Sequence, residues 1–170
     1  MTTLTDFLAA FFPDEDEKIY LRAFKAKSAP DTTDNHALVE VVTRRRLATD
    51  ANLQARMTAA NKTRGWYFVV NSGGNVDADI VRFNAFFIES DSLPIAEQHR
   101  RLDSSPLQPS IRLVTRKSVH AYWLITDECS RTQWQEVQAG LIAHFNSDDT
   151  IKNPSRVMRL PFFNYVLVND

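Results

Sequence analysis

The second half of the chain alternates strand-like and helix-like segments in an order that few folds share. Four segments have the apolar or alternating pattern of β-strands, and two have the spacing of amphipathic helices. In chain order they are the strand Phe83–Ile88, the helix Pro94–Leu102, the strands Ile111–Val114 and Val119–Ile125, the helix Gln133–Phe145 and the strand Arg156–Leu160. The order βαββαβ predicts a split-βαβ sheet with one open face, in which the first and third strands are neighbours.

The sequence of the first half of the chain predicts a smaller lobe that contains both helices and strands. Its expected elements are a helix capped by Thr5 or Asp6 and stopped by Pro13, a strand Ile19–Lys25, a polar loop Ser28–Asn35, a helix Asp50–Asn61 and a strand Trp66–Val70. We therefore expect an α+β fold over residues 1–170. An RRM-like βαββαβ lobe spans residues 79–170, and an N-terminal αβ lobe of residues 1–78 packs on it.

Cysteine and charge content exclude several protein classes. Cys129 is the only cysteine, which rules out an internal disulfide and a Cys-based zinc site and fits a reducing cytoplasm. No apolar run approaches the ~20 residues of a membrane span, and no basic residue precedes the apolar segment 7–12, so we expect neither a membrane protein nor a signal peptide. The net charge of -1 gives no overall attraction to nucleic acid, so such binding would depend on local basic clusters.

An acidic pair follows the first strand of the second lobe. Glu89 and Asp91 are two residues apart, so in extended backbone both side chains leave the same face and can share a divalent cation. Carboxylates combined with substrate phosphates are a sufficient ligand set for Mg²⁺. The structural alternative is that this pair only begins a turn or caps the helix at Pro94.

A polar row follows the basic turn between the next two strands. Ser118, His120 and Tyr122 share one strand face, while the apolar residues between them share the other. With Arg116 and Lys117 in the preceding turn, the hydroxyl and imidazole form a set suited to phosphate contacts. We therefore expect the polar face to be open and the apolar face to be packed. The alternative is a strand histidine partly buried against aromatic rings.

A second acidic pair follows the last helix of the lobe. Asp148 and Asp149 precede Arg156 and Arg159, and the loop that carries them can close over the edge where the other two sets meet. Taken alone, the acids belong to an ordinary helix-terminal loop.

Together these segments resemble three motifs of the archaeo-eukaryotic primase superfamily, in the order found in primase-polymerase domains of plasmid, phage and mobile-element replication proteins. FFIESDSLPIAEQ resembles the first acidic motif, RKSVHAYWLI the Ser-x-His motif, and DDTIKNPSRVMRLP the third acidic motif. NSGGNVDADI resembles the loop that often precedes the first motif. The similarity covers residues 86–164. It departs from the family at Phe162, where glycine commonly follows Arg-Leu-Pro, and at Glu89, where the first acid is more often aspartate.

The resemblance implies a role for each motif residue. Glu89, Asp91 and Asp148 would hold two Mg²⁺ or Mn²⁺ ions, with Asp149 the less favoured alternative to Asp148. Ser118 and His120 would contact the phosphates of the incoming nucleotide. The cations expected near the triphosphate or the template are Arg116, Lys117 and Arg159.

The expected function is therefore template-directed nucleotidyl transfer, as a DNA primase or polymerase, using nucleoside triphosphates and a single-stranded or primed DNA template. Basic residues of the first lobe are either template contacts or an ordinary solvated face; they are Arg44, Arg45, Arg46, Arg56, Lys62 and Arg64. The apolar stretch Tyr165–Val168 close to the last residue, Asp170, suggests a trimmed larger protein with a helicase or helical-bundle partner.

Two other functions compete with this interpretation. A non-catalytic RRM-like domain would bind single strands on sheet aromatics, but the predicted polar face carries acids and His120 instead. A nuclease is the other alternative. The scattered histidines, with no His-x-His pair, disfavour relaxase-type chemistry.

Overall fold

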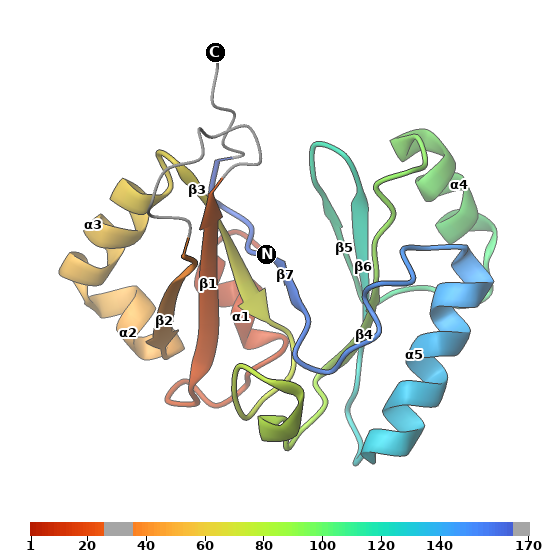
Figure 1. The fold of residues 1–170 in the computed structure, drawn as a ribbon, viewed down its shortest axis with the longest axis horizontal. Coiled ribbons are helices and arrows are strands. Elements are labelled where there is room, and N and C mark those ends of the chain that lie inside the picture. Colours follow the sequence, from red (N-terminus) through yellow and green to blue (C-terminus); the bar gives the residue numbers. More distant parts are fainter. Residues whose placement is uncertain (26–35, 165–170) are drawn as a thin grey trace. The chain divides into compact units, whose positions relative to one another are not determined.

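The computed structural model describes residues 1–25 and 36–164 and divides the chain into two compact units (Figure 1). Unit 1 is Met1–Val69 with Val157–Asp170, and unit 2 is Val70–Arg156. The units differ from the predicted lobes 1–78 and 79–170 because the chain returns to unit 1 after residue 156. The predicted loop at residues 28–35 and the apolar stretch at residues 165–168 lie outside the described residues.

In its described residues, unit 1 has a four-stranded antiparallel sheet and three α-helices. The strand order is β2-β1-β3-β7, with bounds Leu38–Val42, Ile19–Lys25, Arg64–Val69 and Val157–Arg159. The helices are α1 (Leu4–Ala9), α2 (Arg44–Thr49) and α3 (Ala51–Ala60). The first helix begins earlier than predicted, because Thr3 rather than Thr5 or Asp6 is its N-cap and Asp6 completes the capping box.

The core of unit 1 lies on one face of this sheet. The predicted alternation in β1 is confirmed, since Ile19, Leu21 and Ala23 are all fully buried. From β3, Phe68 enters the same core and contacts the rings of Phe7 and Phe11, at centroid distances of 5.5 and 5.3 Å. In Figure 1 helix α1, which carries Phe7, lies behind β1 and β3. The opposite face of the sheet is therefore turned away from α1.

Unit 2 is a three-stranded antiparallel sheet of order β4-β6-β5, with bounds Ala85–Ile88, Val119–Leu124 and Ile111–Val114. Helices α4 (Ile95–Ser104) and α5 (Arg131–Phe145) lie beside this sheet in Figure 1, and a short 3-10 helix covers Asp77–Asp79. The prediction that the first and third strands of this region are neighbours is confirmed by the β4-β6 ladder. Among the described helices, none is long and apolar enough to cross a membrane.

The prediction that the last strand joins this second sheet is wrong. Strand β7 pairs with β3 in unit 1, with Met158 opposite Phe68, so unit 2 does not form the four-stranded RRM-like sheet. Side chains of α5 occupy the edge of β4 that a fourth strand would need. Gln138 accepts from the Phe87 N–H (3.1 Å) and donates to its carbonyl (2.7 Å), and Trp134 donates to the Ala85 carbonyl (3.0 Å). The edge is thus hydrogen-bonded without a strand.

Candidate active site

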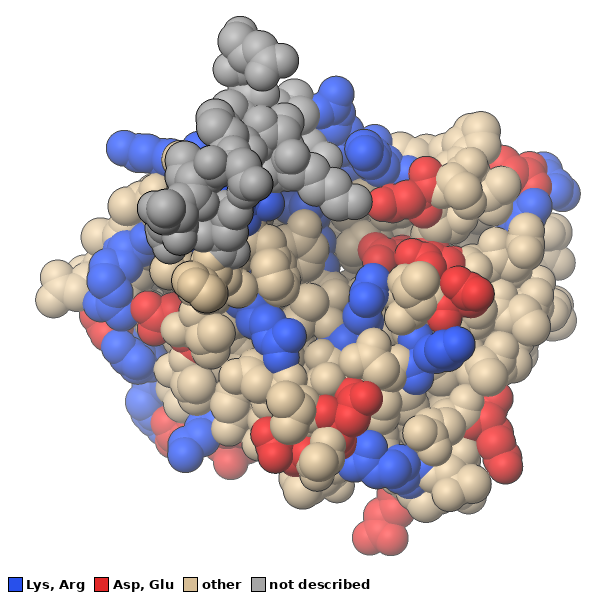
Figure 2. Space-filling model, viewed as in Figure 1, with Lys and Arg blue, Asp and Glu red and all other residues tan. Residues whose placement is uncertain are grey.

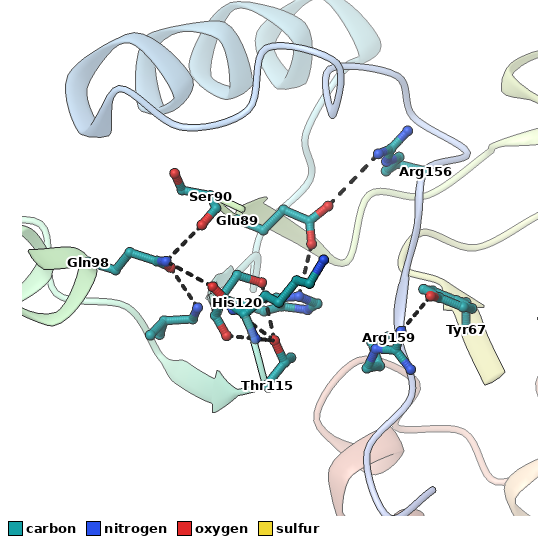
Figure 3. Close-up of polar contacts among 11 residues, drawn as sticks. Tyr67, Glu89, Ser90, Gln98, Thr115, His120, Arg156 and Arg159 are labelled. Atoms are coloured by element: carbon teal, nitrogen blue, oxygen red, sulfur yellow. Dashed lines mark hydrogen bonds and ion pairs between the residues drawn. The ribbon is translucent and has the colours of Figure 1, made fainter. Parts of the chain in front are cut away.

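Glu89 and His120 meet at the end of the β4-β6 ladder (Figure 3). Ile88 pairs with Ala121, so the next position along each strand brings Glu89 opposite His120 on one face. The Oε2 atom of Glu89 lies 2.9 Å from Nε2 of His120. The side chain of Glu89 is 19% exposed and that of His120 is 4% exposed. Strand pairing alone therefore builds this contact from two of the predicted motifs.

Glu89 is held as a carboxylate by its neighbours. Burial raises the pKa of the Glu89 carboxyl, but the hydrogen bond from His120 and the positive charges of His120 and Arg156 outweigh it. The net effect lowers the pKa below its ordinary value of 4.5. Arg156 places a guanidinium nitrogen 3.8 Å from Oε1 of Glu89. Glu89 is therefore ionised at neutral pH and available as a cation ligand.

Asp148 lies beside Glu89. Its backbone N–H donates to the Glu89 carbonyl at 3.0 Å, and its negative charge acts on the Glu89 carboxyl by raising its pKa. The approach follows from Asn146, whose left-handed conformation (φ 48°) ends α5 and turns the chain toward β4. Asp148 is half-buried, whereas Asp149 is exposed. The predicted first and third motifs therefore contact one another through these residues.

Asp91 is not brought into this cluster. It is exposed, in a bend two residues beyond Glu89. Over residues 1–25 and 36–164, no group of three or more His, Cys, Asp or Glu side chains is arranged to hold a metal ion. Two of the three predicted carboxylates, Glu89 and Asp148, are adjacent, and the third is not gathered with them.

The polar face of β6 is not open, contrary to the sequence-based expectation. Ser118, His120 and Tyr122 are at most 3% exposed, and so are Val119 and Ala121 on the other face. Alternation specifies which side chains share a face but not what covers it, and both faces of this strand are buried. Nδ1 of His120 has no hydrogen-bond partner among the described residues. Since Nε2 binds Glu89, Nδ1 is the nitrogen that remains for a ligand.

The remaining predicted residues are distributed over two places. The Ser118 N–H donates to the Thr115 hydroxyl (3.0 Å), which in turn donates to the Ser118 carbonyl (2.8 Å) and closes the β5-β6 turn. Arg116 and Lys117 are exposed in that turn. Arg159 belongs to unit 1, where its guanidinium stacks on the ring of Tyr67.

Two residues of this region were not assigned a role from the sequence. The buried amide of Gln98 in α4 donates to the carbonyls of Ser90 and Leu93, both at 2.7 Å, and accepts from the Val119 N–H at 2.7 Å (Figure 3). It thus joins the segment after Glu89 to the strand of His120. The signal was a glutamine on the buried side of α4, in line with Leu102. Arg156 was present in the third motif without an assigned role.

Comparison with known proteins identifies a group of similar structures. No family model matches the sequence, and no curated protein matches it. The primase-polymerase AEP domain of cyanophage S-2L is 33% identical, with a TM-score of 0.72 over 92% of this chain and 79% of that chain. A crystal structure of primase RepB′ is 11% identical, with a TM-score of 0.61 over 96% of this chain and 51% of that chain.

A second structure of that primase, its catalytic domain in complex with initiator DNA, is 12% identical. Its TM-score is 0.57, over 94% of this chain and 77% of that chain. At such identities the two RepB′ structures share the fold alone. The similarity to the cyanophage domain is greater in sequence and extends over most of both chains. The chain therefore belongs to the archaeo-eukaryotic primase superfamily, among the primase-polymerases.

Proposed function

We propose that this chain catalyses template-directed nucleotidyl transfer, in which a 3′-hydroxyl attacks the α-phosphate of a bound nucleoside triphosphate. Membership among the primase-polymerases supports a primase or polymerase function in replication. The observation that carries the proposal is the ionised Glu89 beside Asp148 and His120, on the three segments that resemble the family motifs. Such an acidic cluster beside the Arg156 guanidinium suits a reaction on phosphates.

The donor set fits a hard divalent cation. Mg²⁺ takes one or two protein carboxylates together with substrate phosphates and water, and Mn²⁺ accepts the same oxygen ligands. Glu89 and Asp148 would hold the ions, with Asp91 as the proposed third ligand. When bound, such ions lower the pKa of the attacking hydroxyl and stabilise the leaving pyrophosphate.

The other residues of the proposed mechanism orient the Glu89 carboxylate and neutralise the charge of the triphosphate. His120 fixes the Glu89 carboxylate through Nε2, and its buried Nδ1 is proposed to contact a phosphate. The Ser118 hydroxyl, just before β6, is proposed to contact the phosphates as well. Arg116 and Lys117, which are exposed, are proposed to neutralise the triphosphate.

Primer extension tests this function. The full chain is incubated with a primed template and labelled deoxyribonucleotides, in Mg²⁺, in Mn²⁺ and in EDTA, with ribonucleotides in parallel. We expect the primer to lengthen with either metal and not in EDTA. Absence of incorporation with both metals and both nucleotide types, together with retained single-strand binding, would establish the non-catalytic binding domain. Shortening of the labelled template would establish a nuclease.

A further inference from the structure

The face of the unit 1 sheet opposite α1, here called the outer face, presents a row of side chains across four strands. Because Ile19, Leu21 and Ala23 point into the core, the residues between them in β1 point outward. Strand register aligns Arg22 of β1 with Val39 of β2 and Tyr67 of β3, and aligns Tyr67 with Arg159 of β7. The row thus alternates cationic and uncharged side chains across the sheet.

Aromatic rings and a guanidinium are packed together on this face. The rings of Phe24 and Tyr67 meet edge to face, with centroids 5.3 Å apart. The guanidinium of Arg159 lies 4.8 Å from the Tyr67 ring centroid and donates to the Tyr67 hydroxyl at 2.6 Å. Gly65 lies opposite Phe24, and a Cβ there would come within 3.0 Å of the Arg159 guanidinium. Glycine at this position leaves room for Arg159 along the sheet.

The outer face is apolar and basic, with no acidic residue among its described strand positions. These positions are Tyr20, Arg22, Phe24, Val39, Val41, Gly65, Tyr67, Val69, Val157 and Arg159. The neighbouring Glu40 lies on the other face of β2 and forms an ion pair with Arg56 of α3 at 3.2 Å. Phe24 is 37% exposed and Val39 is 53% exposed. Figure 2 is drawn from the side of the sheet away from α1, and in the part of this region that grey atoms leave visible, blue side chains lie among tan surface.

We propose that the outer face binds single-stranded nucleic acid by stacking bases on Phe24 and Tyr67. Exposed aromatic rings stack on any unpaired base, and arginines beside them neutralise the phosphates between bases. A duplex would offer phosphates but not base faces, and an acidic peptide would use the arginines but not the rings. The identification of the bound nucleic acid as the template rests on the proposed function, whereas the proposed binding of single-stranded nucleic acid does not.

Equilibrium binding of fluorescein-labelled oligo(dT) to the full chain in EDTA, without nucleotides, tests the proposal. Phe24→Leu removes the π face but keeps an apolar side chain, and Phe24→Tyr keeps the ring. We expect Phe24→Leu to weaken binding at least ~5-fold, the lower end for one lost stacked base, and Phe24→Tyr to bind like the wild type. Both should fold, since Phe24 is exposed, and circular dichroism checks this.

A charge-matched pair tests the role of the arginines. Arg22→Gln and Arg112→Gln remove the same charge, but Arg112 lies in unit 2, where it pairs with Asp103. We expect only Arg22→Gln to weaken binding and to reduce the salt dependence, by about 0.7 in the log-log slope for one phosphate contact.

Three results would overturn the proposal: equal affinities for the wild type and both Phe24 variants, equal effects of the two arginine variants, or a change of self-association in place of oligo(dT) binding. The outcome is independent of catalysis. The wild type could fail to extend a primer while Phe24→Leu binds oligo(dT) more weakly than Phe24→Tyr. That result would support nucleic-acid binding by the outer face and contradict the proposed function.

Discussion

His120 links the site to the stability of unit 2. Its buried imidazole is the hydrogen-bond donor to a carboxylate that is itself largely buried. His120→Ala removes that donor and leaves a cavity, so we expect the free energy of unfolding to fall by about 1–3 kcal/mol. Chemical denaturation measures this, with His99→Ala as the control because His99 is less buried, in α4. An unchanged denaturation midpoint for His120→Ala would contradict the contact with Glu89.

The two acids after α5 differ in their surroundings, and this difference can be tested. Asp148 is half-buried beside Glu89, whereas Asp149 is exposed. We expect Asp148→Asn to reduce nucleotide incorporation at least ~10-fold and Asp149→Asn to leave it within about twofold. Steady-state incorporation rates at fixed metal concentration decide this. A reversed pattern would assign the proposed metal-binding carboxylate to Asp149 in place of Asp148.

At the residue scale, the sequence predicted which site residues lie close together, but not how exposed their side chains are. Alternation and strand order place Glu89 and His120 on one face of neighbouring strands, and the structure confirms it. The same pattern gave no indication that both faces of β6 are buried. The position of Asp91 depends on a bend after β4, and a two-residue spacing defines a shared face only in extended backbone.

Among the elements, α4 holds the two loops of the site together through Gln98. In Gln98→Glu a carboxylate faces the carbonyls of Ser90 and Leu93 and cannot donate to them, so we expect a loss of about 2 kcal/mol or more in unfolding free energy. Gln135→Glu is the matched control, because Gln135 is exposed in α5. Hydrogen exchange at the Val119 amide, which donates to the Gln98 side-chain oxygen, should become faster in Gln98→Leu, because leucine has no acceptor for that N–H. Unchanged exchange would show that Gln98 does not hold the strand.

The loop before β7 is tied to the 3-10 helix by Asp77, which predicts a pH dependence. Burial raises the pKa of Asp77, but hydrogen bonds from the Ser155 N–H and hydroxyl and from Asn153 outweigh it, so the pKa falls below 3.8. A lowered folded-state pKa means that the stabilisation is present above pH 3.8 and is lost as the pH falls through the folded-state value. The stability difference between the wild type and Asp77→Asn should therefore shrink below pH 3.8 in thermal melts. A difference that is constant from pH 6 to about pH 2.5 would contradict this, because the Asn side chain does not titrate.

The elements themselves were more predictable than their partners. Strand β7 was expected from its apolar pattern, but the choice between β3 and β4 depends on side chains far away in sequence. Gln138 and Trp134 satisfy the edge of β4, and Phe68 offers β7 a buried partner for Met158. Local periodicity does not show that helix side chains bind the edge of a strand. It also does not show that two strands some 90 residues apart pair with each other.

Across the whole molecule, the residues of the proposed active site and those of the proposed nucleic-acid face are divided between the two units. Glu89, His120 and Asp148 belong to unit 2, whereas Tyr67 and Arg159 belong to unit 1. The segment around the Arg156–Val157 junction contributes residues to both units, because Arg156 approaches Glu89 in unit 2 and Arg159 stacks on Tyr67 in unit 1. One short stretch of the third motif therefore contributes side chains to the proposed active site and to the proposed nucleic-acid face.

The most direct test of the proposed active site compares Glu89→Gln with Glu136→Gln in primer extension. Both substitutions exchange a carboxylate for an amide, but Glu136 is exposed in α5. Glutamine keeps the shape of the side chain and removes the negative charge that a metal ion requires. We expect Glu89→Gln to lower metal-dependent incorporation by at least ~100-fold while circular dichroism stays unchanged, and Glu136→Gln to retain wild-type rates. Wild-type incorporation by a folded Glu89→Gln protein would show that Glu89 is not a metal ligand in the reaction.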